Sequence, residues 1–213
     1  LILSSGLFCM QIVRYTPVLS QQEIMLKVGA TTVQVGPEWA VDILITVGAF
    51  IALVLIIALL MPKKSQLISE IVINKPKSEV FDFIIHMRNQ EKYSKWVMAD
   101  PNAKLVYKGE DGKVGFISEW KSENKNVGEG AQELIKIVDG EYYEIELRFE
   151  KPFKGVSYSK TSTQTVAQNQ TKVITTFSST TPYPMNIMLP MLKNMLLKDM
   201  NETATNLKKI LES

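Results

Sequence analysis

Cysteine, histidine and an excess of charge of either sign are nearly absent from this sequence. Its 213 residues include one cysteine, Cys9, and one histidine, His86. These counts exclude an intrachain disulfide, a multi-cysteine metal site and a zinc site built from several histidines. The 24 lysines and arginines nearly balance the 22 aspartates and glutamates, which gives a formal net charge of +2, and the lysines are scattered among the acids. We therefore expect no metal and no nucleic-acid partner.

Catalytic motifs are also missing. The sequence contains no Ser-His-Asp order, nucleophile elbow, phosphate-binding glycine loop or metal-ligand spacing. His86 falls toward the polar side of a predicted helix, which indicates a surface residue. The acids of the predicted strands indicate surface charges in the same way: Glu119, Glu133, Glu144 and Glu146. No catalytic residue is assigned, no cofactor is expected, and enzymatic activity stays an open alternative.

One long apolar run is present. From Ile43 to Met61 the chain has nineteen residues without a charged side chain, followed by a proline and two lysines. A helix of that length spans roughly 28 Å, close to the ~30 Å hydrocarbon core of a bilayer, and this run has no polar stripe to face water. A secretion signal needs a basic segment before the run, but Glu38 and Asp42 precede it. A buried helix of a soluble fold would need other elements on every side. We therefore predict one transmembrane helix at residues 43–62.

Flanking lysines give the predicted orientation. Four lysines follow the run at close range: Lys63, Lys64, Lys75 and Lys77. On the other side only Lys27 is near, with Arg14 further away. Lysine and arginine accumulate on the cytoplasmic side of membrane helices. We expect a single-pass protein of the cell membrane with its C-terminal domain in the cytoplasm.

Residues 1–42 carry little information. They show modest alternation typical of strands and no motif, and the first dozen are apolar enough for a second, weaker membrane segment.

Residues 63–213 show the periodicities of an α+β domain. Residues 67–74 alternate as a strand, residues 75–96 have a helical stripe, and a long amphipathic helix is predicted from residue 186 or 191 to 211. Six further strands are predicted at residues 103–109, 114–122, 128–138, 141–153, 156–168 and 172–183. The alternation is clearest at 143–150, where apolar and charged residues take turns, so we expect a sheet with one wet face.

This order of elements resembles the SRPBCC superfamily of START-like, helix-grip proteins, in particular its bacterial polyketide cyclase/dehydrase-type branch. The resemblance covers roughly residues 67–213 and is most specific in "VGEGAQELIKIVDGEYYEIELRFEKPFKG" and "TKVITTFSSTTPYPMNIM". The matching positions are mainly fold-defining: Trp96, Gly115, Trp120, Gly128, Gly130, Phe149, Pro152, Thr171, Lys172, Val173, Leu207, Lys208 and Lys209. The resemblance implies a curved antiparallel sheet of about seven strands wrapped on the C-terminal helix. One fold hosts many functions, so it implies no single activity.

The resemblance also implies an apolar tunnel between sheet and helix for a lipid-like or polycyclic ligand. Such pockets are lined by apolar and aromatic side chains with a few polar groups. The candidate lining residues are Trp96, Phe116, Trp120, Tyr143, Leu147, Phe149, Phe177, Met188, Met191, Leu192 and Met195. The alternative for each is that it simply fills the core.

Methionines are concentrated at the start of the last helix. Five of the ten fall within sixteen residues: Met185, Met188, Met191, Met195 and Met200. Flexible thioether side chains suit surfaces that adapt to varied apolar partners. This segment is interpreted as a cavity lip or lid, a methionine-rich core, or a surface that touches the bilayer.

Three functions fit these patterns. The first is a membrane-anchored domain that binds or transports a hydrophobic small molecule or lipid. The second is a cyclase or dehydratase acting on a hydrophobic substrate. The third is an interaction module whose cavity is filled and whose protein partner is unknown. A buried carboxylate or histidine in the cavity would favour the enzyme, an apolar cavity the binding domain, and no cavity the interaction module.

Overall fold

The structure, a computed structural model, describes residues 11–14, 23–28 and 31–213, except 125–126 and 153. The chain divides into two compact units, Leu1–Leu60 and Met61–Ser213. In the first unit, strands β1 (Gln11–Arg14), β2 (Glu23–Val28) and β3 (Thr31–Pro37) pair antiparallel and precede helix α1 (Glu38–Leu60). The weaker membrane segment considered for the first dozen residues lies mostly outside the described residues.

Helix α1 contains the long apolar run. Within the described part of the chain, one helix, Trp39–Leu60, is long and apolar enough to cross a membrane. It begins before the predicted span and ends one residue before Met61. Apolar side chains are exposed along its length, including Leu44, Phe50 and Leu60.

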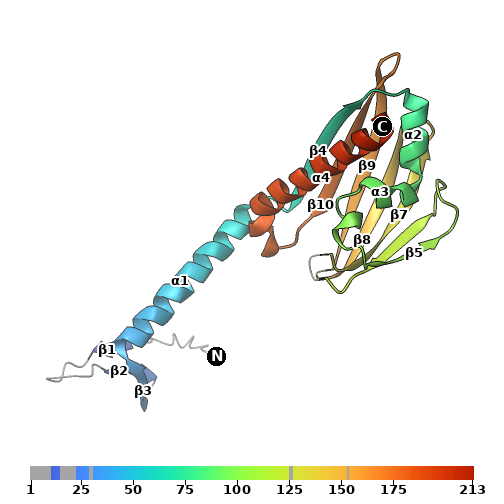
Figure 1. Ribbon diagram of the computed structural model, residues 1–213. Helices are drawn as coiled ribbons and strands as arrows, with labels where there is room; N and C mark the ends of the chain where they lie inside the picture. The colour runs from blue at the N-terminus through green and yellow to red at the C-terminus, as the bar shows by residue number, and fades with distance from the viewer. Residues whose placement is uncertain (1–10, 15–22, 29–30, 125–126, 153) are drawn as a thin grey trace, which may run out of the picture. The chain divides into compact units, whose positions relative to one another are not determined.

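The second unit is one seven-stranded antiparallel sheet with helices on one face (Figure 1). Its strands are β4 (Lys64–Ile73), β5 (Lys104–Lys108), β6 (Ile117–Lys121), β7 (Glu129–Val138), β8 (Tyr142–Lys151), β9 (Gly155–Ala167) and β10 (Gln170–Thr180). They are ordered β4-β10-β9-β8-β7-β6-β5. A short 3-10 helix, η3 (Met185–Met188), leads into the long C-terminal helix α4 (Leu189–Glu212). The predicted fold class and strand number are confirmed.

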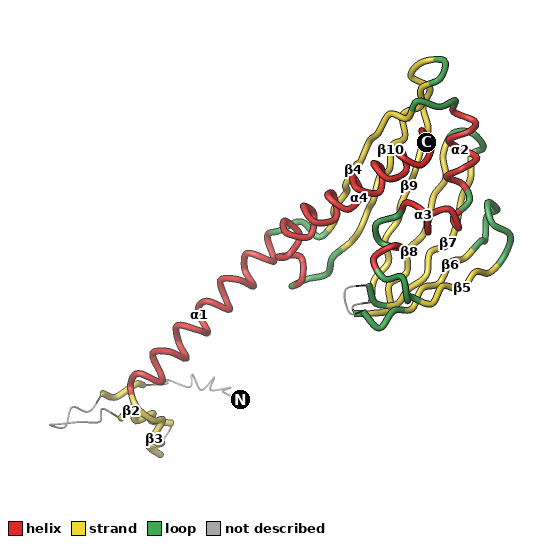
Figure 2. The backbone as a smooth tube through the Cα atoms, viewed as in Figure 1, coloured by secondary structure: helices red, strands yellow, loops and turns green. Residues whose placement is uncertain are grey.

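The helix predicted for residues 75–96 is wrong as a single element (Figure 2). The segment forms α2 (Lys77–Ile85), η1 (Met87–Asn89), α3 (Gln90–Tyr93) and η2 (Val97–Ala99). The backbone leaves the helical region at His86. There the Met87 N–H donates to the Asp111 carboxylate at 2.8 Å, and the Asn89 amide donates to the Phe83 carbonyl at 2.8 Å. These bonds satisfy polar groups that the interrupted helix leaves free.

The hydrophobic core occupies one end of the helix-covered face. There α2 and the C-terminal half of α4 pack on the strands. The core contains Ile73, Val80, Phe81, Ile84, Phe116, Leu134, Tyr143, Ile145, Val173, Leu207 and Leu211. The same face near the N-terminal half of α4 is less filled, because β9 places small side chains there. Ser157, Ser159 and Thr161 are its inward residues at this level.

Candidate functional site

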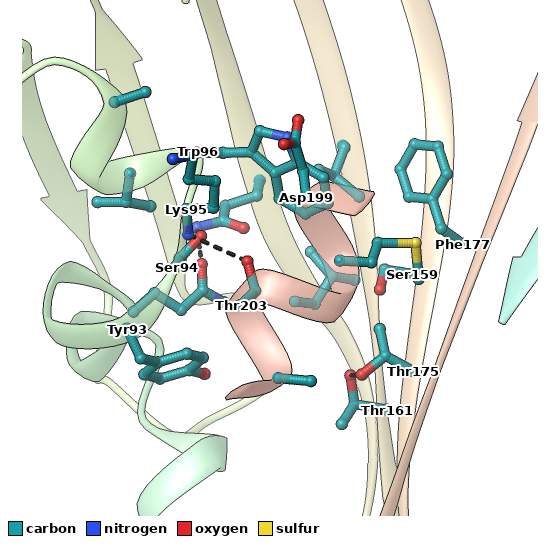
Figure 3. Close-up of a pocket in the computed structure, with 18 of the residues that line it drawn as sticks. Tyr93, Ser94, Lys95, Trp96, Ser159, Thr161, Thr175, Phe177, Asp199 and Thr203 are labelled. Carbon is teal, nitrogen blue, oxygen red and sulfur yellow. Dashed lines mark hydrogen bonds between the residues drawn. The ribbon is translucent and has the colours of Figure 1, made fainter. Parts of the chain in front are cut away.

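A cavity of about 720 Å³ lies between the sheet, the α3–η2 segment and α4. This volume is within the range of small-molecule sites. Apolar lining residues from the sheet are Ile71, Leu105, Trp120, Ile145, Leu147, Phe149, Val173 and Phe177. Those from the helices and their connections include Ile84, Trp96, Val97, Met195, Leu196, Met200, Ala204 and Leu207. Figure 3 shows lining side chains from both sides pointing toward the space between them. The cavity is mainly apolar.

A row of hydroxyl groups crosses the cavity wall. Ser69, Thr175, Thr161 and Tyr143 occupy directly paired positions on β4, β10, β9 and β8, and all four line the cavity. We call these four residues the hydroxyl row. The Thr161 and Thr175 hydroxyls lie 3.2 Å apart and point toward one another (Figure 3). Ser69 donates to the Asn201 side chain of α4 at 2.7 Å. A hydroxyl has one donor and two acceptor sites, so a bonded row keeps capacity for a ligand.

Tyr93 extends the hydroxyl row from Tyr143 across the cavity. Tyr93 of α3 is buried and faces Tyr143 of β8. Burial raises the pKa of Tyr93 well above its usual value, and the adjacent Tyr143 raises it further. Burial also raises the pKa of Tyr143, against the opposing effect of hydrogen bonds with Thr161 and Tyr93. Both phenols are therefore neutral at physiological pH and act as hydrogen-bonding hydroxyls rather than as acids or bases.

Formal charge is confined to the edge of the cavity. Lys95 and Asp199 are the charged residues among the described lining residues, and both are partly exposed. The Lys95 ammonium pairs with Glu202 at 2.8 Å, while its backbone N–H donates to the Thr203 hydroxyl at 3.0 Å (Figure 3). His86 does not line the cavity, and no group of histidine, cysteine and acidic residues in the described part of the chain could hold a metal ion.

The cavity opens at one end of the sheet, as the exposure of lining residues there indicates. Trp120, Gly130 and Phe149 are paired across β6, β7 and β8, and the Trp120 and Phe149 rings meet edge to face at 5.8 Å. A Cβ on Gly130 would lie 2.4 Å from the Trp120 ring, so a residue with a side chain at position 130 would displace the ring. Trp96 and Met195 are lining residues with exposed side chains and mark the opening.

Seven of the predicted lining residues meet in this cavity: Trp96, Trp120, Tyr143, Leu147, Phe149, Phe177 and Met195. Four do not line it. Phe116 is 1% exposed and stacks on Tyr107 in the core, with ring centroids 5.8 Å apart. Met188 and Met191 project to the surface, and Leu192 is only partly exposed on α4. Ligand binding by the seven stays a prediction.

Sequence reasoning missed most polar members of the wall. The hydroxyls of Ser69, Thr161 and Thr175, the phenol of Tyr93 and the bonded amides of Gln90 and Gln132 were not predicted. Strand β9 has polar residues at successive positions, so its alternation does not reveal which face is inward.

Comparisons with known proteins found similarity of fold but no sequence match. No family model matches the chain, and no curated protein matches it. One similar structure is that of norcoclaurine synthase from Thalictrum flavum, solved with dopamine and hydroxybenzaldehyde. Its sequence is 13% identical to this one, and its fold superposes with a TM-score of 0.53 over 70% of this chain and 86% of the synthase chain. A protein from Nitrosospira multiformis is 15% identical, with a TM-score of 0.51 over 70% of this chain and 97% of its own. XoxI from Bacillus cereus is 14% identical, with a TM-score of 0.52 over 69% of this chain and 95% of its own.

The second unit therefore has the helix-grip fold that the sequence resemblance implied, as the seven-stranded antiparallel sheet, the long C-terminal helix and these neighbours agree. The likeness reaches the fold alone, so the polyketide cyclase-type branch stays a prediction.

Proposed function

We propose that residues 61–213 bind one uncharged, largely apolar molecule in the cavity, and that α1 anchors this domain in a membrane. A lipid alcohol, a quinone or an isoprenoid has the required chemistry. The observation that carries the proposal is a cavity of about 720 Å³ with a mainly apolar wall and a hydroxyl row. The norcoclaurine synthase structure, whose fold is shared, holds small aromatic molecules. This supports the use of the fold for ligand binding.

The hydroxyl row and Tyr93 would orient such a ligand. Neutral hydroxyls can both donate to and accept from an alcohol, carbonyl or ether group. A buried anionic head would lack a compensating charge, because the one lining lysine in the described part of the chain is paired with Glu202 at the edge. We therefore place the uncharged head of the ligand at the hydroxyl row and its apolar body toward Trp120 and Phe149.

Binding is better supported than the alternatives. A cyclase or dehydratase would need a positioned acid or base. Of the described lining residues, Asp199 is the one carboxylate and it lies at the exposed edge, and none is a histidine. The raised pKa values of Tyr93 and Tyr143 hold these phenols neutral. An interaction module with a filled cavity is less supported, because the cavity is large.

One measurement of the ligand class is organic extraction of the full chain after purification from its native membrane. The extract should contain an uncharged amphiphile enriched over the bulk lipid.

A second measurement compares two probes with the full chain in lipid nanodiscs. Pyrene-labelled dodecanol should bind at least tenfold more tightly than pyrene-labelled dodecanoate, since only the carboxylate would bury an unpaired charge. Energy transfer from Trp96 and Trp120 to pyrene reports binding, because both indoles line the cavity. Equal affinity for the two probes, or no binding of either, would reject the proposal.

The cytoplasmic location of the domain is a separate expectation that rests on the flanking lysines. A cysteine replaces Val166, which is 55% exposed, in a Cys9→Ser background. A membrane-impermeant maleimide should leave this cysteine unlabelled in intact cells and label it fully after permeabilisation. Labelling in intact cells would place the domain outside and refute the expected orientation.

A further inference from the structure

The segment that leads into α4 carries no charge and exposes several methionines. No charged residue occurs from Val173 to Leu192. Within this stretch and the next turn of α4, Met188, Met191 and Met195 are 40%, 64% and 53% exposed. Their spacing of three and four residues puts them on one side of the chain. We call these three residues the methionine rim. The other side of the same turns packs inward through Leu189.

Hydrogen bonds within the second unit hold this segment beside the residues that follow α1. The buried Asn186 side chain donates to the Met61 carbonyl at 3.0 Å. The Thr181 N–H donates to the Lys63 carbonyl at 2.8 Å, which continues the pairing of Thr180 with Lys64. Met61 directly follows the last residue of α1 in the chain. The methionine rim is therefore on the part of the domain where the chain arrives from the apolar helix.

The cavity opens at the same end of the sheet. One pairing row runs through Ser65, Ser179, Ser157 and Leu147 on β4, β10, β9 and β8. Phe149 lies two residues beyond Leu147 on β8, where it pairs with Gly155, and its neighbour Trp120 lies at the same level. Lys63 and Thr181, which are joined by a hydrogen bond, likewise lie two residues beyond the Ser65–Ser179 pair, so they are at the same end of the sheet as Phe149 and Trp120. Met195 belongs both to the methionine rim and to the cavity lining.

We propose that the methionine rim rests in the interface of the bilayer that α1 crosses, so that the cavity exchanges its ligand directly with that bilayer. Exposed thioethers beside a charge-free segment fit the boundary between headgroups and acyl chains, where Tyr183, also exposed, suits the polar side. This inference rests on the anchoring proposed for α1. It adds a second contact with the membrane and a path by which an apolar ligand avoids water.

A depth measurement on the full chain tests the contact. Single cysteines replace Met191 or Val166 in the Cys9→Ser background and carry the fluorophore NBD. Val166 is the matched control, because it is 55% exposed and apolar but lies at the other end of β9, about 30 Å along the strand from Ser157. In nanodiscs with brominated acyl chains, the emission of NBD at position 191 should lie at shorter wavelength than that of NBD at position 166. Its fluorescence should also be quenched at least twofold more strongly. Equal quenching at the two positions overturns the inference.

A transfer measurement tests the exchange path. Met191 does not line the cavity, so Met191→Glu should leave the equilibrium binding of pyrene-labelled dodecanol unchanged. It should slow transfer of the probe from vesicles to the nanodisc-held protein at least fivefold, because it places a charge in the interface. Met191→Leu and Val166→Glu should transfer at the wild-type rate. Wild-type transfer by Met191→Glu overturns the path.

The outcomes separate this inference from the proposed function. A full chain that does not remain in nanodiscs overturns the anchoring and the rim contact together. A wild-type chain that stays embedded but binds no probe rejects the ligand proposal, while the depth measurement still decides the rim contact. An embedded chain that binds the probe, with NBD at position 191 unquenched, overturns the rim contact alone.

Discussion

Replacing Ser159 with phenylalanine should strongly weaken ligand binding and leave the domain folded. Ser159 lies on β9 between Phe177 of β10 and Ile145 of β8, and its side chain lines the cavity (Figure 3). A phenyl ring there would occupy space meant for the ligand instead of overlapping packed atoms, so the usual cost of overpacking, about 1–3 kcal/mol, should be absent. We expect the affinity for pyrene-labelled dodecanol to fall at least tenfold, and the melting temperature to change little.

The control variant changes the same strand on its other face. Val156 is 47% exposed and does not line the cavity. Val156→Phe should therefore bind the probe as the wild type does. If Ser159→Phe also keeps wild-type affinity, the ligand does not occupy this cavity.

Replacing Phe116 with alanine should have the opposite profile. Phe116 is 1% exposed, stacks on Tyr107 and lies outside the cavity wall. Truncation of a fully buried phenylalanine costs about 3–5 kcal/mol, a large part of the roughly 5–15 kcal/mol that stabilises a domain. Chemical denaturation of the full chain in nanodiscs should show this loss, and the protein that remains folded should bind the probe with wild-type affinity.

Phe149→Ala is the matched comparison for Phe116→Ala. Phe149 is only partly buried and lines the cavity beside Trp120. Its truncation should cost less stability and should weaken probe binding. If both truncations destabilise the domain equally and neither affects binding, the division between core and cavity wall is wrong.

Much of this fold is predictable from the sequence because one face of the sheet is exposed to solvent. On β8, Tyr143 and Ile145 are buried while Glu144 pairs with Lys160 and Glu146 with Arg148 on the other face. Such alternation of apolar and charged residues indicates which side chains of a strand point inward. The break at His86 was not predictable in this way, because the Asp111 carboxylate that accepts the Met87 N–H comes from a loop 24 residues after Met87.

The cavity itself was only partly predictable. Large apolar residues such as Trp120 and Phe177 are candidates for any inward face, but alternation does not say whether they pack a core or border a space. Phe116 and Phe149 show the difference, since both point inward and only Phe149 meets the cavity. The size of the side chains that face an inward residue decides whether it packs in a core or borders a cavity. That depends on register across β8, β9 and β10, which links residues distant in sequence.

Strand β9 separates the specificity of this domain from its stability. Its position is held by backbone pairing with β8 on one side and β10 on the other, and this pairing does not depend on the size of its side chains. The hydrophobic core lies on other residues, including Leu134 and Leu207. Substitution at Ser159 can therefore reshape the binding space at little cost to folding, whereas the buried Thr161 is held by hydrogen bonds with Thr175 and Tyr143. A change in the size of the residue at position 159 is therefore a route by which the same scaffold can adapt to ligands of different bulk.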